Sequence, residues 1–334
     1  MNDYYQVEID GHFSSYKFYN TFLPELHKYF NGPSSEQKIL ISFANIKKIS
    51  PLVIPNLFNV GLILKDYFNN PVQLFIPWDK KILAYLRDIN FFSINNDLEI
   101  FNIDERFTGD IPQDRSISDI CGTIQIGSDL KKEEIYNCYI SKYKTPIEKQ
   151  LKDEKLVDRI LYVMAELSHN GASHSKGICF VSFQLNQLNK FEFSVSDCGI
   201  GYRTSLLGKK ERNFFKNFNQ TETNPSNHFA SILEAIYYRK KEYEKIYGVY
   251  SIFKDILPLD GVIRLHTHNT QAIFTKYNFS KYLYEDPDES LVKDIINSFI
   301  LSSETASERK YNPVRIDSAK FKGVHIEIEI PLGL

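Results

Sequence analysis

The residues best placed to do chemistry stand on one predicted helix, over residues 147–173 and running on to Ser175. Glu166, Asn170 and His174 follow one another at four-residue intervals, so they share one helix face. A carboxylate can orient or deprotonate a water, and a carboxamide oxygen is a ligand that Mg²⁺ accepts. The alternative is an ordinary solvated polar face. The apolar residues of the same segment form a separate stripe at three- and four-residue spacing: Leu156, Ile160, Val163, Met164 and Leu167.

A turn with two glycines follows the helix after two predicted strands, at 178–185 and 191–195. Asp197 stands where the second strand ends, and Gly199 and Gly201 come directly behind it. A carboxylate at this position can accept a hydrogen bond from an amino group, such as that of adenine. Glycine allows a ligand to approach the backbone closely. The competing interpretation is a plain Asp-x-Gly turn between two elements.

Taken together, the helix, the hairpin and the turn resemble the GHKL ATPase superfamily, which includes gyrase, histidine kinases and anti-sigma-factor kinases. Glu-Leu-Ser-His-Asn at 166–170 resembles the N-box, and Asp-Cys-Gly-Ile-Gly at 197–201 resembles the G1 box. The run ELxxNxxxHS is closest to the anti-sigma-kinase-like and stand-alone members.

The resemblance also assigns roles to single residues. It implies that Asn170 holds Mg²⁺ and that Glu166 activates water or an acceptor hydroxyl. It further implies that Asp197 reads the adenine amino group, that Gly199 and Gly201 shape the nucleotide pocket, and that His174 joins the nucleotide-binding residues.

The segment after residue 201 corresponds, by this resemblance, to the ATP lid and its glycine-rich G2 box. Only Gly248 remains of those glycines, and it precedes a predicted helix over 249–257. Backbone N–H groups at a helix start suit phosphate. Lys245 is a candidate for a further phosphate contact, with a solvated helix face as the alternative. The loss of the other glycines of the G2 box argues against fast ATP turnover more than against ATP binding.

The rest of the C-terminal part fits the Bergerat fold of that superfamily, for which we expect a mixed sheet with helices on one face. Strands are predicted over 262–267, 272–275 and 324–330. Residues 280–320 have the character of an insertion with one helix. His266 and His268 would share a strand face, but no third ligand lies near them in sequence, so we expect no metal site there.

The N-terminal part alternates strands and helices, which predicts a small α/β sandwich. Its element order resembles a STAS domain, the fold of anti-sigma-factor antagonists. Ser50 is the only candidate for the phospho-acceptor hydroxyl of that family, and the DSSG turn is missing; a simple helix N-cap is the alternative. The predicted elements, strand and helix in turn, are 4–9, 12–30, 38–43, 51–68, 72–76 and 80–88.

We therefore expect an α/β (α+β) chain with a STAS-like domain over 1–104, a connecting segment over 105–143 and a GHKL domain over 144–334. The composition is that of a globular protein, with 334 residues, 43% hydrophobic and 25% charged. A net charge of −2 gives no indication of nucleic-acid binding. The four cysteines have no regular spacing and no apolar run could cross a bilayer, so we expect a cytoplasmic protein with no membrane contact.

Three functions follow from the resemblance. The first is a Mg-ATP-dependent conformational switch, in signalling or defence, that hydrolyses ATP slowly and engages a protein partner or a second copy of the chain. The second is a serine/threonine protein kinase that acts on a STAS-like partner. The third is a nucleotide-binding scaffold without hydrolysis, against which the retained Glu166 argues.

Overall fold

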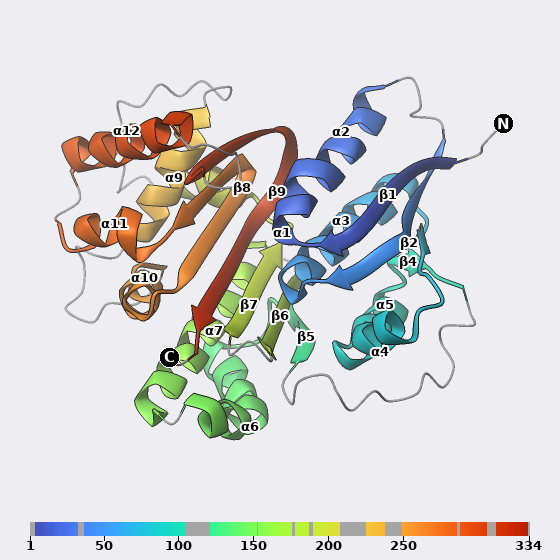
Figure 1. Cartoon of the computed structure of the whole chain (residues 1–334), viewed down its shortest axis with the longest axis horizontal. Coiled ribbons are helices and arrows are strands. Elements are labelled where there is room, and N and C mark those ends of the chain that lie inside the picture. Colours follow the sequence, from blue (N-terminus) through green and yellow to red (C-terminus); the bar gives the residue numbers. More distant parts are fainter. Residues whose placement is uncertain are drawn as a thin grey trace.

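The computed structural model describes ten segments of the chain. They are residues 4–32, 37–104, 121–151, 153–175, 178–186, 190–207, 225–237, 249–285, 288–305 and 312–332. Within them the chain is mixed α/β, as expected, and builds one parallel and one antiparallel sheet (Figure 1).

The N-terminal half forms a four-stranded parallel sheet in the order β1-β2-β3-β4. Its strands are β1 (Tyr4–Phe13), β2 (Lys38–Ile49), β3 (Val72–Phe75) and β4 (Phe101–Asn102). The connecting helices are α1 (Ser15–Lys17), the π-helical turn η1 (Phe18–Phe22), α2 (Leu23–Asn31), the 3₁₀ turn η2 (Pro51–Val53), α3 (Ile54–Phe68), α4 (Lys80–Asp88) and α5 (Phe91–Leu98). The predicted alternation of strands and helices is confirmed, although its likeness to a STAS domain stays a prediction.

Short-range chemistry sets the boundaries of these helices. The hydroxyl of Ser50 accepts a hydrogen bond from the N–H of Leu52 at 3.3 Å, which caps η2. The carboxylate of Asp79 caps α4 in the same way. Asn69 ends α3 in the left-handed conformation, at φ 51°. Ser50 is buried and η2 packs against the C-terminal sheet, so its hydroxyl acts as a helix cap.

The C-terminal half forms a five-stranded sheet in the order β5-β6-β7-β9-β8. Its strands are β5 (Cys121–Gly127), β6 (Ile178–Asn186), β7 (Lys190–Asp197), β8 (Val262–Phe274) and β9 (Val314–Pro331). The helices are α6 (Lys132–Leu151), α7 (Glu154–Ser175), α8 (Gly201–Leu207), α9 (Pro225–Tyr237), α10 (Val249–Ile256), the 3₁₀ turn η4 (Leu257–Leu259), α11 (Lys276–Leu283) and α12 (Glu289–Thr305).

Three expectations for this half need correction. The sheet is not mixed, because all four of its pairings are antiparallel: β6 and β7 form a hairpin, and β9 runs against both of its neighbours. Residues 121–143, expected to connect two domains, instead supply the edge strand β5 and the start of α6, which packs on α7. Residues 314–320, expected within an insertion, are the first part of β9.

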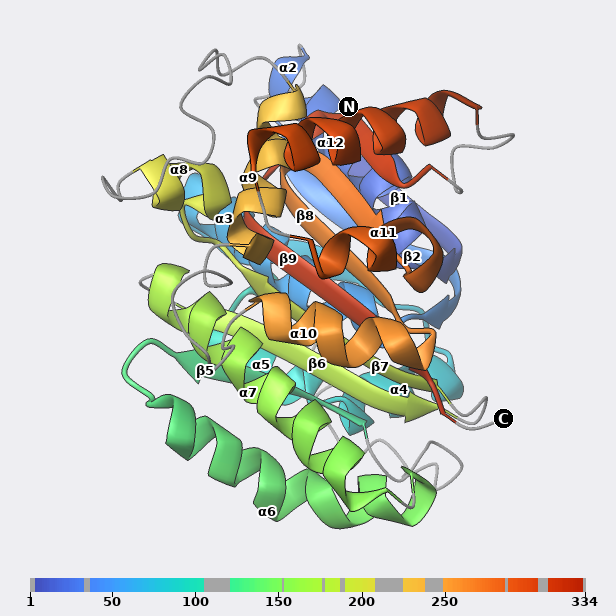
Figure 2. The same cartoon turned by 90° about the vertical axis from the view of Figure 1, so that its left-hand side faces the viewer.

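The two faces of this sheet differ in chemistry. Figure 2 shows α7 and α10 lying across one face, which we call the helix face. Its strand residues are buried and apolar: Val181, Phe183, Phe191, Phe193, Val195, Ile263, Leu265, Ile326, Ile328 and Ile330. The opposite face, which we call the docked face, carries the alternating residues and lies against the N-terminal half.

The docked face is mostly polar, and yet it is buried. One row of paired residues crosses the sheet as Thr123, Ser182, Ser194, Glu327 and Arg264. The next row is Phe180, Ser196, His325 and His266. Except for Arg264, every one of these side chains is at most 2% exposed. The N-terminal half therefore covers the surface that the alternation in the strands would leave to solvent.

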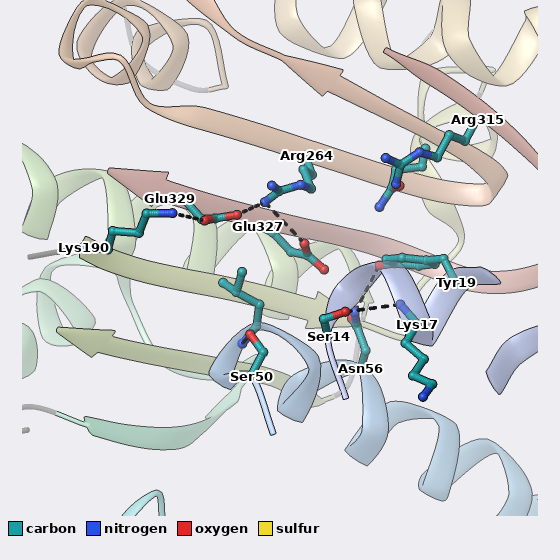
Figure 3. Close-up of polar contacts among 12 residues, drawn as sticks. Ser14, Lys17, Tyr19, Ser50, Asn56, Lys190, Arg264, Arg315, Glu327 and Glu329 are labelled. Atoms are coloured by element: carbon teal, nitrogen blue, oxygen red, sulfur yellow. Dashed lines mark hydrogen bonds and ion pairs between the residues drawn. The ribbon is translucent and has the colours of Figure 1, made fainter. Parts of the chain in front are cut away.

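Aromatic rings hold the two halves together. Phe58 of α3 stacks on Phe180 of β6, with ring centroids 5.1 Å apart. Tyr19 of η1 stacks on His266 of β8 at 4.4 Å and accepts a hydrogen bond from Asn56 at 3.0 Å. Figure 3 shows Tyr19 and Asn56 facing the strand that carries Glu327. The hydrophobic core of the N-terminal half thus includes Phe180, Ala319 and Phe321 of the C-terminal half.

Candidate functional site

The predicted polar face of α7 is present, and two of its three residues meet. Asn170 donates a hydrogen bond from Nδ2 to Oε1 of Glu166 at 3.3 Å. Glu166 is buried, with 5% exposure, whereas Asn170 is partly exposed. The apolar stripe of the helix faces the core, as expected. His174 lies in the last turn of α7, and its side chain is outside the described residues.

Close packing at Gly171 brings this helix to the strand end that carries Asp197. A Cβ atom at residue 171 would lie 2.7 Å from Sγ of Cys179 and 3.2 Å from Cγ1 of Val195. Cys179 is paired with Asp197 across β6 and β7. A larger residue after Asn170 would push α7 off the sheet, so glycine keeps the amide and the carboxylate of the two motifs in one region.

Lys132 is a member of the site that local sequence patterns do not reveal. Its Nζ lies 2.6 Å from Oε2 of Glu166 and 2.5 Å from the hydroxyl of Tyr162. Burial lowers the pKa of Lys132, but the hydrogen bonds to Glu166 and Tyr162 outweigh it, so the pKa stands above its ordinary value. The lysine is therefore charged and neutralises the carboxylate. It comes from α6, far from the N-box in sequence, which is why its role was missed.

Asp197 ends β7 with a buried carboxylate that is 4% exposed. Its Oδ1 accepts hydrogen bonds from the N–H of Gly199 at 2.7 Å and from the N–H of Val324 at 3.4 Å. Burial raises the pKa of Asp197 to about 7, and those two N–H groups oppose the rise. No hydrogen bond reaches Oδ2 from the described part of the chain. The side chain is thus fixed through one oxygen and open at the other.

Two glycines in left-handed conformations shape the backbone around this carboxylate. Gly201 has φ +73°, and Gly323, between the two parts of β9, has φ +99°. A Cβ at residue 323 would lie 1.8 Å from the carbonyl oxygen of Asp197, which no side chain could tolerate. Gly199 and Gly201 were predicted to shape the pocket. Gly323, which directly precedes the strand predicted over 324–330, was not among them.

The other residues considered in the sequence lie outside the described part of the chain or on β8. Gly248 and Lys245 lie outside the described residues. His266 and His268 do not share a face, because the strand register breaks between residues 267 and 270 and His268 takes φ +58°. His266 stacks on Tyr19, and His268 stacks on His228 of α9 at 4.2 Å. Within the described segments no group of three or more histidine, cysteine or acidic side chains could hold a metal ion.

No protein-family model, curated protein or solved structure matches the chain. Among the described residues no helix is long and apolar enough to cross a membrane. The arrangement itself offers a carboxylate and a carboxamide on one helix, a second buried carboxylate with one open oxygen, and glycine-shaped backbone between them.

Proposed function

We propose that the chain binds Mg-ATP between α7 and the turn after β7 and works as a nucleotide-dependent switch of the GHKL type. The observation that supports this best is the state of Asp197. Two backbone N–H groups fix its Oδ1, while its Oδ2 has no partner among the described residues. An acceptor that is buried, oriented and unshared suits the amino group of adenine.

The residues on α7 have the chemistry that Mg²⁺ and phosphate require. The Nδ2 of Asn170 points to Glu166, so the amide oxygen of Asn170 is left for a cation. When bound, Mg²⁺ would neutralise the phosphate oxygens and hold them in place. Asn170 would hold the cation, and Gly171 keeps that side chain beside the turn of Asp197.

Glu166 is the candidate catalytic residue, and its ion pair with Lys132 bears on the rate. Nζ of Lys132 lies 2.6 Å from Oε2 of Glu166, and Oε1 accepts the hydrogen bond from Asn170, so both oxygens of the carboxylate are engaged. Activation of water by Glu166 would therefore require Lys132 to move. We infer that hydrolysis is slow in this arrangement, and the same ion pair supports a non-hydrolysing nucleotide-binding scaffold as the second candidate function.

A protein kinase acting on its own N-terminal half receives little support. Ser50, the one candidate acceptor hydroxyl, is buried and caps η2. A kinase acting on a separate STAS-like partner is distinguished from an ATPase by where the labelled phosphate goes.

The test is incubation with γ-labelled ATP and Mg²⁺, with free phosphate and labelled protein scored separately. Glu166→Gln should abolish phosphate release and leave the ATP Kd within about threefold, because the carboxylate acts on water rather than on the nucleotide. Asp197→Asn should weaken ATP binding at least tenfold, since an amide has only one acceptor and adds a donor.

Lys132→Met provides the matched comparison. If Lys132→Met releases phosphate faster than the unaltered chain, the protein is a switch ATPase whose hydrolysis the ion pair slows. If the variant and the unaltered chain both bind ATP without releasing phosphate, the protein is a scaffold. Label transferred to an added STAS-like protein identifies the kinase. If the unaltered chain does not bind ATP in calorimetry, the proposed function is refuted.

A further inference from the structure

The residue before Asp197 points through the sheet to its other side. Successive side chains of β7 alternate between the faces, so Asp197 lies on the helix face and Ser196 on the docked face. Ser196 is fully buried, and the residues around it belong to the N-terminal half and to β9. The carboxylate proposed to bind the adenine amino group therefore lies on the opposite side of the sheet from the interface between the two halves.

A chain of three hydrogen bonds runs through Ser196. Asn59 of α3 donates from Nδ2 to Oγ of Ser196 at 2.6 Å, and that hydroxyl lies 2.6 Å from Nδ1 of His325. The Nε2 of His325 lies 3.0 Å from the carbonyl oxygen of Lys322. Each side chain in this chain is at most 1% exposed except that of Lys322, which contributes only its backbone.

The chemistry of the groups fixes the direction of every bond. A carbonyl only accepts, so Nε2 of His325 carries the proton and donates to Lys322. Burial holds the pKa of His325 well below its ordinary value, so the ring is neutral and Nδ1 accepts from Ser196. Ser196 thus donates its hydroxyl proton to Nδ1 of His325, and its oxygen accepts the hydrogen bond from Nδ2 of Asn59.

The far end of this chain reaches the carboxylate of Asp197. Lys322, Gly323 and Val324 belong to an irregular segment of β9, where the register to β8 shifts, and the N–H of Val324 donates to Oδ1 of Asp197 at 3.4 Å. Thr267 of β8 holds this segment through a hydrogen bond to the carbonyl of Gly323 at 3.1 Å. If His325 shifts, the carbonyl of Lys322 and the N–H of Val324 shift with it, and the carboxylate loses one of its two fixed contacts.

We propose that Ser196 and His325 are positioning residues for Asp197, and that Asn59 connects the N-terminal half to the carboxylate that binds the adenine amino group. This inference rests on the proposed function. A partner that moved Asn59 on binding the N-terminal half would alter the affinity for the nucleotide, and the nucleotide would alter the affinity for that partner by the same factor, because coupling between two binding sites is reciprocal.

The experiment compares two ligands, ATP and purine riboside triphosphate, which lacks only the amino group on the base. Their Kd ratio reports what the carboxylate contributes. The unaltered chain should bind ATP more tightly than purine riboside triphosphate, by about tenfold or more. Ser196→Ala and Asn59→Ala should each bring the ratio to within about threefold of one and leave the Kd of purine riboside triphosphate nearly unchanged. A merely structural role would weaken both ligands equally.

Ser194→Ala is the control, because Ser194 lies on the same strand and face but has no hydrogen-bond partner in the described segments. It should keep the parental ratio. An unchanged ratio in a folded Ser196→Ala variant that binds ATP overturns the positioning role alone, as does equal weakening of both ligands. If the unaltered chain binds neither triphosphate, the proposed function itself has failed and the inference falls with it.

Discussion

The two faces of the C-terminal sheet are both covered but are built from different chemistry. The helix face is packed with phenylalanine, isoleucine, valine and leucine, whereas the docked face carries serine, histidine, glutamate and arginine. Apolar packing is non-directional and scales with area, whereas a buried polar group is stable only while its partner is in place. We therefore expect the helix face to supply most of the stability and the docked face to determine how the two halves fit.

The helix face should show the larger loss on truncation. Phe193 is 1% exposed at the centre of the sheet, so Phe193→Ala should lower the free energy of unfolding by about 3–5 kcal/mol. Urea unfolding followed by circular dichroism measures the change, with Phe193→Leu as the conservative control. A loss below about 1 kcal/mol would show that this face is not the main source of stability.

Removal of the aromatic contact on the docked face should lower the free energy of unfolding by an intermediate amount, with its local effect on α3 and β6. Phe180→Ala removes the ring that stacks on Phe58, and we expect a loss of about 3 kcal/mol. Hydrogen exchange should rise in α3 and β6 together, because both lose that contact. Exchange that rises only in the helices over the helix face would contradict the division between the two faces.

The buried carboxylates of the docked face should give stability an unusual pH dependence. Burial, partly offset by Arg264 at 4.0 Å, raises the pKa of Glu327 from 4.5 to about 7. A raised pKa stabilises the fold below about pH 4.5 and withdraws that stabilisation as the pH rises through 7. Glu327→Gln should therefore flatten the stability profile between pH 4.5 and 7, by about 3 kcal/mol over that window.

Glu329 is the matched control, because it pairs with the same arginine and also with Lys190 at 3.4 Å (Figure 3). Burial raises the pKa of Glu329, but these two cations outweigh it and the pKa lies below its ordinary value. Its stabilisation is present above pH 4.5 and is lost in acid, so Glu329→Gln should destabilise the fold at neutral pH. If the two substitutions changed the dependence of stability on pH in the same direction, the opposite pKa shifts of Glu327 and Glu329 would be refuted.

The smallest effect should come from Ser194, whose hydroxyl has no hydrogen-bond partner in the described residues. Ser194→Ala should change the free energy of unfolding by less than about 0.5 kcal/mol or stabilise the fold slightly, since no bond is broken. Thermal unfolding by calorimetry resolves this. A loss above about 1.5 kcal/mol would mean that the polar residues of this face contribute stability without regard to their partners.

Local patterns account for much of this molecule. Apolar residues at alternate positions in 191–195 and 324–330 predicted strands with one buried face, and the caps at Ser50 and Asp79 mark helix starts. Strict alternation is typical of a half-buried strand, whereas here the polar residues between the apolar ones are buried too. The cover over them comes from α3, more than a hundred residues earlier in the chain, and no local pattern encodes such a contact.

The candidate site shows the same limit. Glu166, Asn170 and Asp197 could be predicted because each motif is short and contiguous. Lys132 could not, because it meets Glu166 only when α6 packs on α7. The bulge at His268 was also missed, since a residue other than glycine with positive φ leaves no mark in hydrophobic periodicity.

The position of β9 between β7 and β8 has a consequence for how the protein is made. The N-terminal sheet can close once residue 102 has been synthesised, but β7 and β8 have no shared partner until β9 emerges more than two hundred residues later. Until then β7 has an unpaired edge, and its polar face can rest only on the N-terminal half already folded. That half would serve as the surface on which the second sheet is completed.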